Sequence, residues 1–397
     1  MNKDALKKNI SKGIKEGKNT VKKTVEKIVE KINEVKDNSS HDYYDYIEYY
    51  GDYSFEEREF NEIDNIILSM LSYVDFTGIV SENNKNKKSI SEISSIFFSK
   101  YTKKDIDKNI TATREGIKLL EKISNTKRFK DVELFNYLYL GDENSQFSAI
   151  TFDLKNGIYY IGFEGTDKLI SGWEEDCKMA YSFPVEAHML SKKYIDKFTL
   201  TKNKLIIGGH SKGGNLALVA SMYSNFFVKR KIIKIYSNDG QGLRLAQIES
   251  KYYKKIEDRF IHIIPDSSIV GLLLRHTDKY IVVKSNMPGL ISHNPATWQI
   301  NYNTFQRAKL TRFSKVFDDG FSKWLDNYDD EKRRLFVKSM FDILRENKIE
   351  TLLQFKDNYK LIQKVIKSSK NIDPIVKEMG MELIKVIAKT NLEYPLL

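Results

Sequence analysis

The sequence predicts an α/β fold with a mainly parallel central sheet, and three observations indicate it. Short apolar, β-branched segments alternate with helix-forming segments between residues 147 and 284, which is typical of parallel strands covered by helices. An apolar run, Leu205–Ile207, stops at two glycines and is followed by a helix-forming segment that begins at Asn215. From about Asn303 onward the pattern is helical and no strand is evident.

Composition describes a globular protein with a polar surface. The 397 residues are 41% hydrophobic and 30% charged, and Cys177 is the only cysteine, which excludes an internal disulfide and a cysteine-based metal cluster. No apolar run approaches the roughly 20 residues of a membrane span, and the N-terminus lacks the apolar core of a secretory signal. We therefore expect a cytoplasmic or peripheral membrane location, with export that needs no cleaved signal peptide as the alternative.

The net charge of +11 favours anionic partners, and its densest part is the N-terminal arm, residues 1–40. Because no zinc-finger spacing or aromatic RNA-binding strand accompanies the charge, we expect an anionic membrane surface and no nucleic acid as the partner. The residue pattern of this arm predicts a basic amphipathic helix, and a solvated tail is the alternative. Its apolar residues recur at helical steps: Leu6, Ile10, Ile14, Val21, Val25, Ile28, Ile32 and Val35.

The charge pattern inverts at residue 41, which places a boundary near residue 40. An acidic, Tyr-rich stretch covers residues 41–62, and the apolar spacing from Asn61 to Phe76 predicts a helix.

Two strands, Phe147–Leu154 and Ile158–Phe163, are joined by the Asn-Gly pair that favours tight hairpins. Pro184 is suited to the first turn of a helix that extends to Phe198.

The segment Gly209-His-Ser-Lys-Gly213 matches the pattern G-x-S-x-G between a strand and a helix. A serine on such a sharp turn presents its hydroxyl outward, and the glycines remove Cβ atoms that would collide there. The sequence thus predicts Ser211 as a nucleophile. The alternative is a glycine-rich turn that binds phosphate; a P-loop, however, has a Lys-Ser/Thr pair after its last glycine, and Asn215-Leu216 stands here.

Three further strands and four helices follow the serine. The strands are expected at Lys231–Ser237, Arg259–Ile264 and Lys279–Lys284. The helices are expected at residues 313–327, 329–346, 349–368 and 373–391. The chain therefore divides into a basic arm (residues 1–40), an α/β domain (residues 41–303) and a helical C-terminal subdomain (residues 304–397).

The motifs at Phe163-Glu-Gly-Thr166, Gly209–Gly213, Asp266 and His293 resemble those of class-three lipases, which are α/β-hydrolases related to fungal triglyceride lipases. The likeness is greater to a lipase-like bacterial branch of that fold and spans residues 43–345. The resemblance implies a serine esterase or lipase that needs no metal and no cofactor; some relatives are phospholipases.

A serine hydroxyl needs a base, and in this fold the order along the chain is Ser, then Asp or Glu, then His. His262 lies inside a predicted strand and His276 directly before one, where a packing role is expected. His293 follows the last strand in a loop, so position and resemblance both select His293 as the base.

The acid that orients the imidazole has two candidates, because Asp239 and Asp266 both end predicted strands. The hydrolase fold places the acid two strands after the nucleophile strand, and the family pattern agrees, so we expect Asp266. Asp239 precedes Gly240 and is interpreted as part of a turn.

The oxyanion hole requires two preset donors. One is expected to be the backbone N–H of Lys212, which follows the nucleophile, and the resemblance implies Thr166 as the other. We expect the Lys212 side chain to reach solvent; the alternative is that its charge near the pocket steers an anionic head group. Apolar residues in the segments 167–183 and 269–274 could line an acyl groove or belong to the core.

The leading hypothesis is a serine carboxylic-ester hydrolase, a lipase or phospholipase that forms an acyl-enzyme on Ser211. One alternative keeps the triad but assigns a small soluble ester or thioester. The other makes the chain a non-catalytic membrane- or partner-binding module with a relic hydrolase core.

Overall fold

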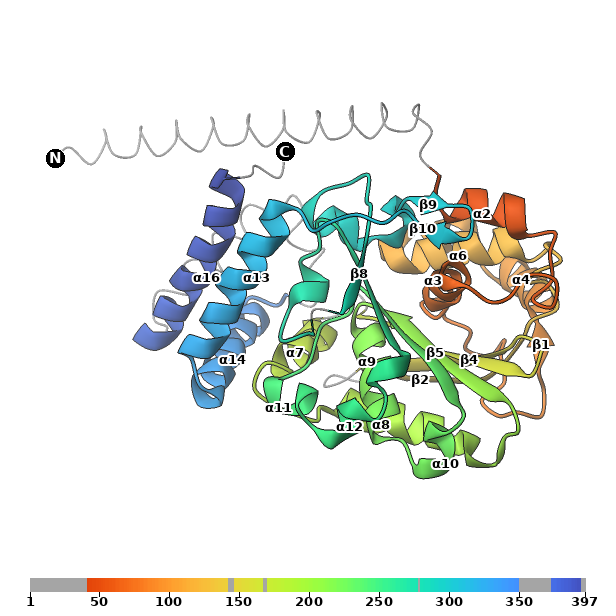
Figure 1. Cartoon of the computed structure of the whole chain (residues 1–397), viewed down its shortest axis with the longest axis horizontal. Coiled ribbons are helices and arrows are strands. Elements are labelled where there is room, and N and C mark those ends of the chain that lie inside the picture. The colour runs from red at the N-terminus through yellow and green to blue at the C-terminus, as the bar shows by residue number, and fades with distance from the viewer. Residues whose placement is uncertain (1–40, 142–145, 167–169, 278, 350–372, 394–397) are drawn as a thin grey trace.

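The computed structural model describes residues 41–141, 146–166, 170–277, 279–349 and 373–393. The basic arm and most of the helix expected at residues 349–368 lie outside these ranges. Figure 1 shows helices on both sides of the central sheet, with the C-terminal helices at one end of the molecule. No described helix combines the length and the apolar composition needed to cross a membrane.

The central sheet has eight strands in sequence order, and the predicted α/β class is confirmed. The first four strands pair antiparallel, whereas β4 to β8 are all parallel. The sequence pattern did not indicate β1 or β2. The strands are β1 Lys88–Ser89, β2 Glu133–Gly141, β3 Gln146–Asp153, β4 Ile158–Phe163, β5 Lys204–His210, β6 Ile232–Asn238, β7 Phe260–Pro265 and β8 Tyr280–Val283. A separate pair is formed by β9 Ile300–Asn301 and β10 Thr304–Phe305.

Both faces of the sheet are covered. In β5, Ile206 packs into one apolar cluster, whereas Leu205 and Ile207 pack into the other, as the alternation of a strand requires. The first cluster is closed by the N-terminal helices: α2 Tyr43–Tyr50, α3 Glu62–Leu71, α4 Ile90–Lys100, α5 Lys103–Asp107 and α6 Thr111–Ile123. The second is closed mainly by α8 Glu186–Asp196 and α9 Lys212–Tyr223. The short helices α10 Phe226–Lys229, α11 Leu245–Ile248 and α12 Lys251–Lys254 connect the later strands.

Helix α3 is fixed at its start by polar contacts. The side chain of Asn61 caps the helix and accepts hydrogen bonds from the N–H groups of Ile63 and Asp64. Asp64 in turn forms a fully buried ion pair with Arg128, with Nη2–Oδ2 at 2.5 Å and Nε–Oδ1 at 2.7 Å. A paired and hydrogen-bonded carboxylate is tolerated inside a protein, so the helix keeps one orientation against the sheet.

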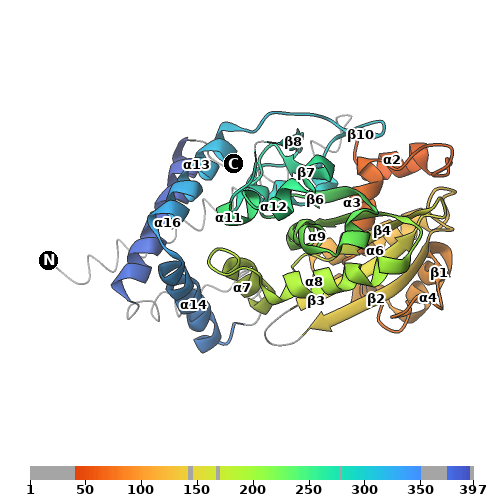
Figure 2. The same ribbon diagram turned by 60° about the horizontal axis from the view of Figure 1, so that its bottom comes forward.

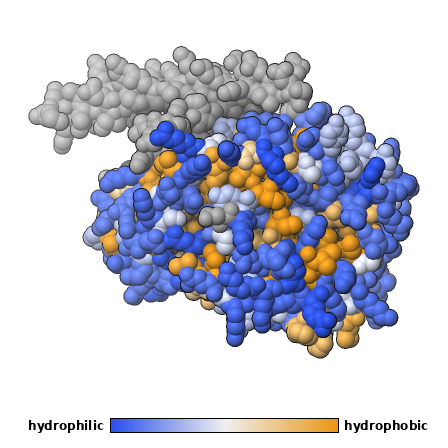
Figure 3. Space-filling model, viewed as in Figure 1, coloured by the Kyte–Doolittle hydropathy of each residue, from blue (hydrophilic) through white to orange (hydrophobic). Residues whose placement is uncertain are grey.

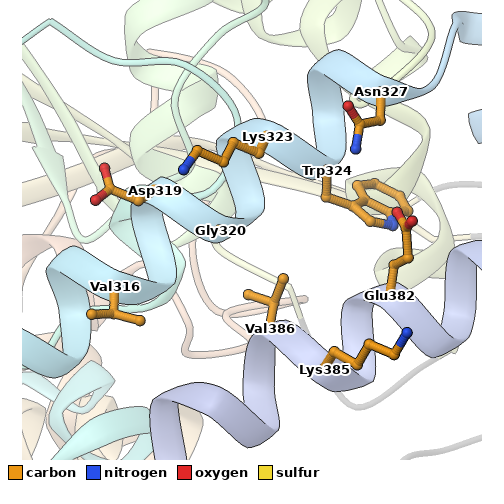
Figure 4. Close-up of a pocket in the computed structure, with 9 residues that line it drawn as sticks. All are labelled: Val316, Asp319, Gly320, Lys323, Trp324, Asn327, Glu382, Lys385 and Val386. Atoms are coloured by element: carbon orange, nitrogen blue, oxygen red, sulfur yellow. The ribbon is translucent and has the colours of Figure 1, made fainter. Parts of the chain in front are cut away.

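The C-terminal helices expected at 313–327, 329–346 and 373–391 are confirmed as α13 Arg312–Asn327, α14 Asp330–Glu346 and α16 Pro374–Glu393. Figure 2 shows them next to α7 Ile170–Lys178, which Arg345 of α14 contacts through Glu174. Between α13 and α16 lies an open groove of about 410 Å³ beside Trp324 (Figure 4). The domain boundaries at residues 40 and 303 stay predictions.

Candidate active site

The predicted strand–serine–helix turn is present. Strand β5 ends at His210, α9 begins at Lys212, and Ser211 between them has φ 57° and ψ −133°, a strained conformation for a non-glycine residue. A Cβ on Gly209 would lie 2.3 Å from the carbonyl carbon of Gly213, and one on Gly213 would lie 2.1 Å from the Phe163 oxygen. Both glycines are therefore required by close backbone approach.

His293 lies beside this turn. Its ring is 4.4 Å from that of His210, the residue before Ser211, measured between ring centroids. His293 ends the short 3₁₀ turn Gly289–His293, which follows β8, as expected from its position in the sequence. The structure thus brings the predicted base to the neighbourhood of the predicted nucleophile.

The acid beside His293 is Asp239, and the prediction of Asp266 is wrong. Nδ1 of His293 lies 2.6 Å from Oδ2 of Asp239, whose side chain is fully buried. Oδ1 of Asp239 accepts hydrogen bonds from Ser268 Oγ at 2.6 Å and from the Gly271 N–H at 3.0 Å. Both carboxylate oxygens therefore have partners, and one of them fixes the imidazole. Asp239 follows β6, one strand after the nucleophile strand rather than two.

Asp266 has a different role. Its Oδ2 pairs with Lys284 Nζ at 2.9 Å. Its backbone oxygen accepts hydrogen bonds from Thr311 N at 2.8 Å and Ser314 Oγ at 3.3 Å, at the start of α13. Asp266 therefore joins the end of β7 to the C-terminal helices.

His210 connects the nucleophile strand to the base. Burial and the nearby His293 lower the pKa of His210 well below its ordinary value, so the ring is neutral at pH 7. Its Nδ1 lies 3.0 Å from the Tyr73 hydroxyl, and its Nε2 lies 2.8 Å from the backbone oxygen of His293. A carbonyl only accepts, so Nε2–H donates to His293 and Tyr73 donates to Nδ1.

Side chains of helix α3 form hydrogen bonds with the strand ends beside the Ser211 turn. Asn65 Nδ2 donates to Asn238 Oδ1 at 2.8 Å, and Asn238 Nδ2 donates at 3.0 Å both to Ser69 Oγ and to the Gly209 oxygen. Asn65 and Ser69 are four residues apart and so share one face of the helix, and Tyr73 lies in the turn that follows it. These side chains contact the last residues of β5 and β6, which directly precede Ser211 and Asp239.

Thr166 and Lys212, the predicted oxyanion donors, share one partner. Oγ1 of Thr166 donates to Oδ2 of Asp176, and Nζ of Lys212 lies 3.9 Å from Oδ1 of the same residue. The Lys212 side chain is only 1% exposed and pairs with Glu175 at 2.5 Å, so the expectation that it reaches solvent is wrong. Burial raises the pKa of Asp176 to about 6, against the opposing effect of Lys212.

The two segments that could line an acyl groove differ in the structure. In 269–274, Leu272 is fully buried and Val270 is 9% exposed, so this segment belongs to the core. In the first segment, residues 167–169 lie outside the described ranges, Met179 is buried, and Trp173 on α7 is 40% exposed.

Comparison with known proteins places the chain in a family. Solved structures similar to it include the M37 lipase (16% identity, 52% of this chain and 68% of the lipase covered, TM-score 0.30) and a fungal lipase–inhibitor complex (14% identity, 64% of this chain and 89% of the lipase covered, TM-score 0.35). No significantly similar sequence was found among curated proteins. The profile of the Mbeg1-like family matches residues 123–342, more than half of the chain. The chain thus belongs to the Mbeg1-like family, and its mainly parallel central sheet with the strand–serine–helix turn is the arrangement of an α/β-hydrolase.

Proposed function

We propose that this chain is a serine carboxylic-ester hydrolase that acts on lipid esters through an acyl-enzyme on Ser211. The observation that carries the proposal is the 2.6 Å contact between Asp239 and His293, formed beside the strained turn that presents Ser211. A nucleophile, a base and a group that orients the base are the parts that acyl transfer by serine requires.

In the proposed first half-reaction, Ser211 Oγ bonds to the ester carbonyl carbon while its proton passes to Nε2 of His293. The carbonyl π electrons move to oxygen, then return as the bond to the alcohol oxygen breaks, and the alcohol leaves with the proton from His293. In the second half, water gives its proton to His293 and attacks the acyl carbon, and Ser211 regains the proton as the acid departs. Asp239 holds Nδ1–H and stabilises the imidazolium in both halves.

The negative charge on the carbonyl oxygen needs donors that are already in place. We assign these to the backbone N–H groups of Lys212 and Thr166. Lys212 is the first residue of α9, where backbone N–H groups lack helical partners and the helix dipole favours negative charge. Because Thr166 and Lys212 both contact Asp176, one acid on α7 fixes the side chains of both residues.

The preference for lipid rests on apolar side chains that neighbour the site. Leu290 and Ile291, three and two residues before His293, are 65% and 42% exposed, and Trp173 on α7, the helix that carries Asp176, is 40% exposed. Figure 3 shows apolar residues gathered within an otherwise hydrophilic face. Exposed apolar groups grouped near a catalytic centre suit a substrate with an acyl chain. We further propose that residues 1–40 hold the enzyme at an anionic membrane surface.

Labelling with a fluorophosphonate probe tests the proposal. The wild-type chain should be labelled, Ser211→Ala should not, and Ser99→Ala, which changes an exposed serine on α4, should be labelled like the wild type. Equal labelling of wild type and Ser211→Ala, or none of the wild type, refutes the enzyme and favours a non-catalytic binding module.

Substrate class is tested with p-nitrophenyl esters of increasing chain length. A rate that rises sharply when the ester aggregates supports the lipase assignment. A rate that is highest on short monomeric esters or thioesters supports a small-molecule esterase with the same triad.

A further inference from the structure

One buried tyrosine lies between the loops that carry the predicted nucleophile and the predicted oxyanion donor. Tyr73 lies in the turn after α3 and is 3% exposed. Its hydroxyl lies 3.0 Å from Nδ1 of His210, which directly precedes Ser211. Gly165, which directly precedes Thr166, lies against the same hydroxyl, since a Cβ on this glycine would lie only 1.9 Å from the oxygen. A single side chain from outside the site therefore touches both loops.

His210 extends this contact to the predicted base, and chemistry fixes the direction of each hydrogen bond. Nε2–H of His210 donates to the backbone oxygen of His293 at 2.8 Å, because a carbonyl oxygen only accepts. The neutral ring carries one proton, so its Nδ1 accepts and the Tyr73 hydroxyl donates. Burial raises the pKa of Tyr73, and the N–H of Gly165 opposes that rise by donating to the hydroxyl oxygen. The hydrogen bonds thus run in one direction, from Gly165 through Tyr73 and His210 to His293.

The Tyr73 hydroxyl selects the tautomer of His210. With the proton on Nδ1 instead, Nε2 would turn a lone pair toward the His293 oxygen, and that hydrogen bond would be lost. Nδ1 is buried, so without the hydroxyl it would be an acceptor that lacks a donor, a costly state in a protein interior. The backbone oxygen of His210 lies 3.3 Å from the same hydroxyl, farther than the ring nitrogen.

The backbone of His293 decides where its imidazole lies. His293 is the last residue of the 3₁₀ turn Gly289–His293, and its Nδ1 meets Asp239 at 2.6 Å. A shift of about 1 Å in a catalytic group can cost roughly 100-fold in rate. Hydrogen bonds that hold this backbone therefore affect the chemistry without touching the substrate.

We propose that Tyr73 is a positioning residue, which fixes the backbone of His293 through the ring of His210 and holds the loop of Gly165 against the same hydroxyl. The expected effect on rate rests on the proposed function. The tautomer of His210 does not depend on it.

Tyr73→Phe removes the hydroxyl and keeps the ring. The rate constant for labelling of Ser211 by a fluorophosphonate probe, and kcat on a soluble p-nitrophenyl ester, should each fall about 10- to 100-fold, because the base is less well placed. KM should change by less than about twofold, since no group that binds the ester is removed. The final extent of labelling should equal that of the wild type, because the serine is intact.

Tyr194→Phe on α8 is the matched control. Tyr194 is 1% exposed, its hydroxyl donates to the Asn136 oxygen at 2.8 Å, and it lies 2.8 Å from Thr151 Oγ1, so this variant loses the same kind of buried group. It should lose thermal stability to a similar degree and keep the wild-type rate of labelling. Equal rates for wild type and Tyr73→Phe overturn the inference. Equal losses of rate in both tyrosine variants also overturn it, because they would reflect stability alone.

Nitrogen NMR of the histidine side chains reads the tautomer of His210 directly. Its signals are identified among those of the six histidines by their absence from His210→Gln. In the wild type at pH 7 the ring should carry its proton on Nε2 alone, and Tyr73→Phe should show the form with the proton on Nδ1. An unchanged tautomer in Tyr73→Phe overturns the inference whatever the rate. A wild-type ring that is charged or protonated on Nδ1 also overturns it, which keeps the test valid if Tyr73→Phe does not fold.

The two measurements separate this inference from the proposed function. A tautomer that changes in Tyr73→Phe, in a protein whose wild type is not labelled, supports the hydrogen bonds of Tyr73 and defeats only the esterase. Normal labelling of the wild type, with neither rate nor tautomer altered in Tyr73→Phe, defeats only the role of Tyr73.

Discussion

Nδ1 of His293 lies 2.6 Å from Oδ2 of Asp239, across 54 positions of sequence, whereas Asp266 pairs with Lys284. The two aspartates have the same residue type, similar burial and the same kind of place at a strand end. They are therefore a matched pair for the first prediction.

Asp239→Asn should lower kcat on a soluble p-nitrophenyl ester by roughly 10³–10⁴-fold, because the imidazole loses the carboxylate that fixes its tautomer and stabilises its charged form. Asp266→Asn should change kcat only a few-fold. Steady-state kinetics on both variants, with thermal melting to confirm folding, make the comparison. The opposite order of the two effects would return the acid role to Asp266.

Lys212→Met should destabilise the fold by about 3–5 kcal/mol, because Glu175 is left as a buried, unpaired carboxylate. The double variant Lys212→Met/Glu175→Gln should recover most of that loss. Urea unfolding of the wild type, both single variants and the double variant gives the coupling. Losses that simply add would contradict the buried pair.

Acid should destabilise the fold through buried histidines. Burial lowers the pKa of His188 and of His262 from 6.5 to about 4, so between these values the unfolded chain binds protons that the folded chain does not. The contribution of each histidine to the free energy of unfolding is therefore fully present above pH 6.5. It is lost as the pH falls toward 4, by up to roughly 3 kcal/mol for each histidine. Asp176 acts in the opposite direction, since its raised pKa favours the folded state below pH 4 and loses that effect as pH rises through 6.

The histidine contribution is measured as a difference. Urea unfolding from pH 4 to 7 should give a shallower dependence on pH for His188→Gln than for the wild type. Parallel curves would show that His188 does not contribute.

Removal of residues 1–40 should leave hydrolysis of a short soluble ester unchanged and weaken binding to anionic vesicles. The reason is that the arm holds the densest positive charge of the chain, while every candidate catalytic residue lies beyond residue 160. Vesicle sedimentation at low and high salt measures the effect, with neutral vesicles as the control. Unaltered sedimentation with anionic vesicles would refute the arm's role.

Local patterns predicted much of the fold. The turn around Ser211, the hairpin at Asn156-Gly157 and three C-terminal helices all depend on residues close in sequence, so motif and periodicity sufficed. Strand β2 was missed because it follows a polar stretch without a clear period-two pattern.

The errors at the site come from long-range packing. Asp239-Gly240 has the composition of an ordinary turn, and only the fold of the loop after β7 brings Ser268 and Gly271 to its carboxylate. On an isolated helix the Lys212 side chain would extend into solvent. In the folded chain it is buried because it forms an ion pair with Glu175, 37 positions earlier. No spacing rule within one sequence gives these pairings.

The support of the site by α3 has a consequence for biosynthesis. Asn65 meets its partner 173 positions later, and Tyr73 meets His210 137 positions later. The ribosome therefore synthesises helix α3 early. The turn at Ser211 gains its contacts with α3 only after β6 has been synthesised, and His293 follows some fifty residues later. A growing polypeptide thus has no complete candidate site until about three quarters of it has been translated, so the proposed hydrolysis cannot begin before that point.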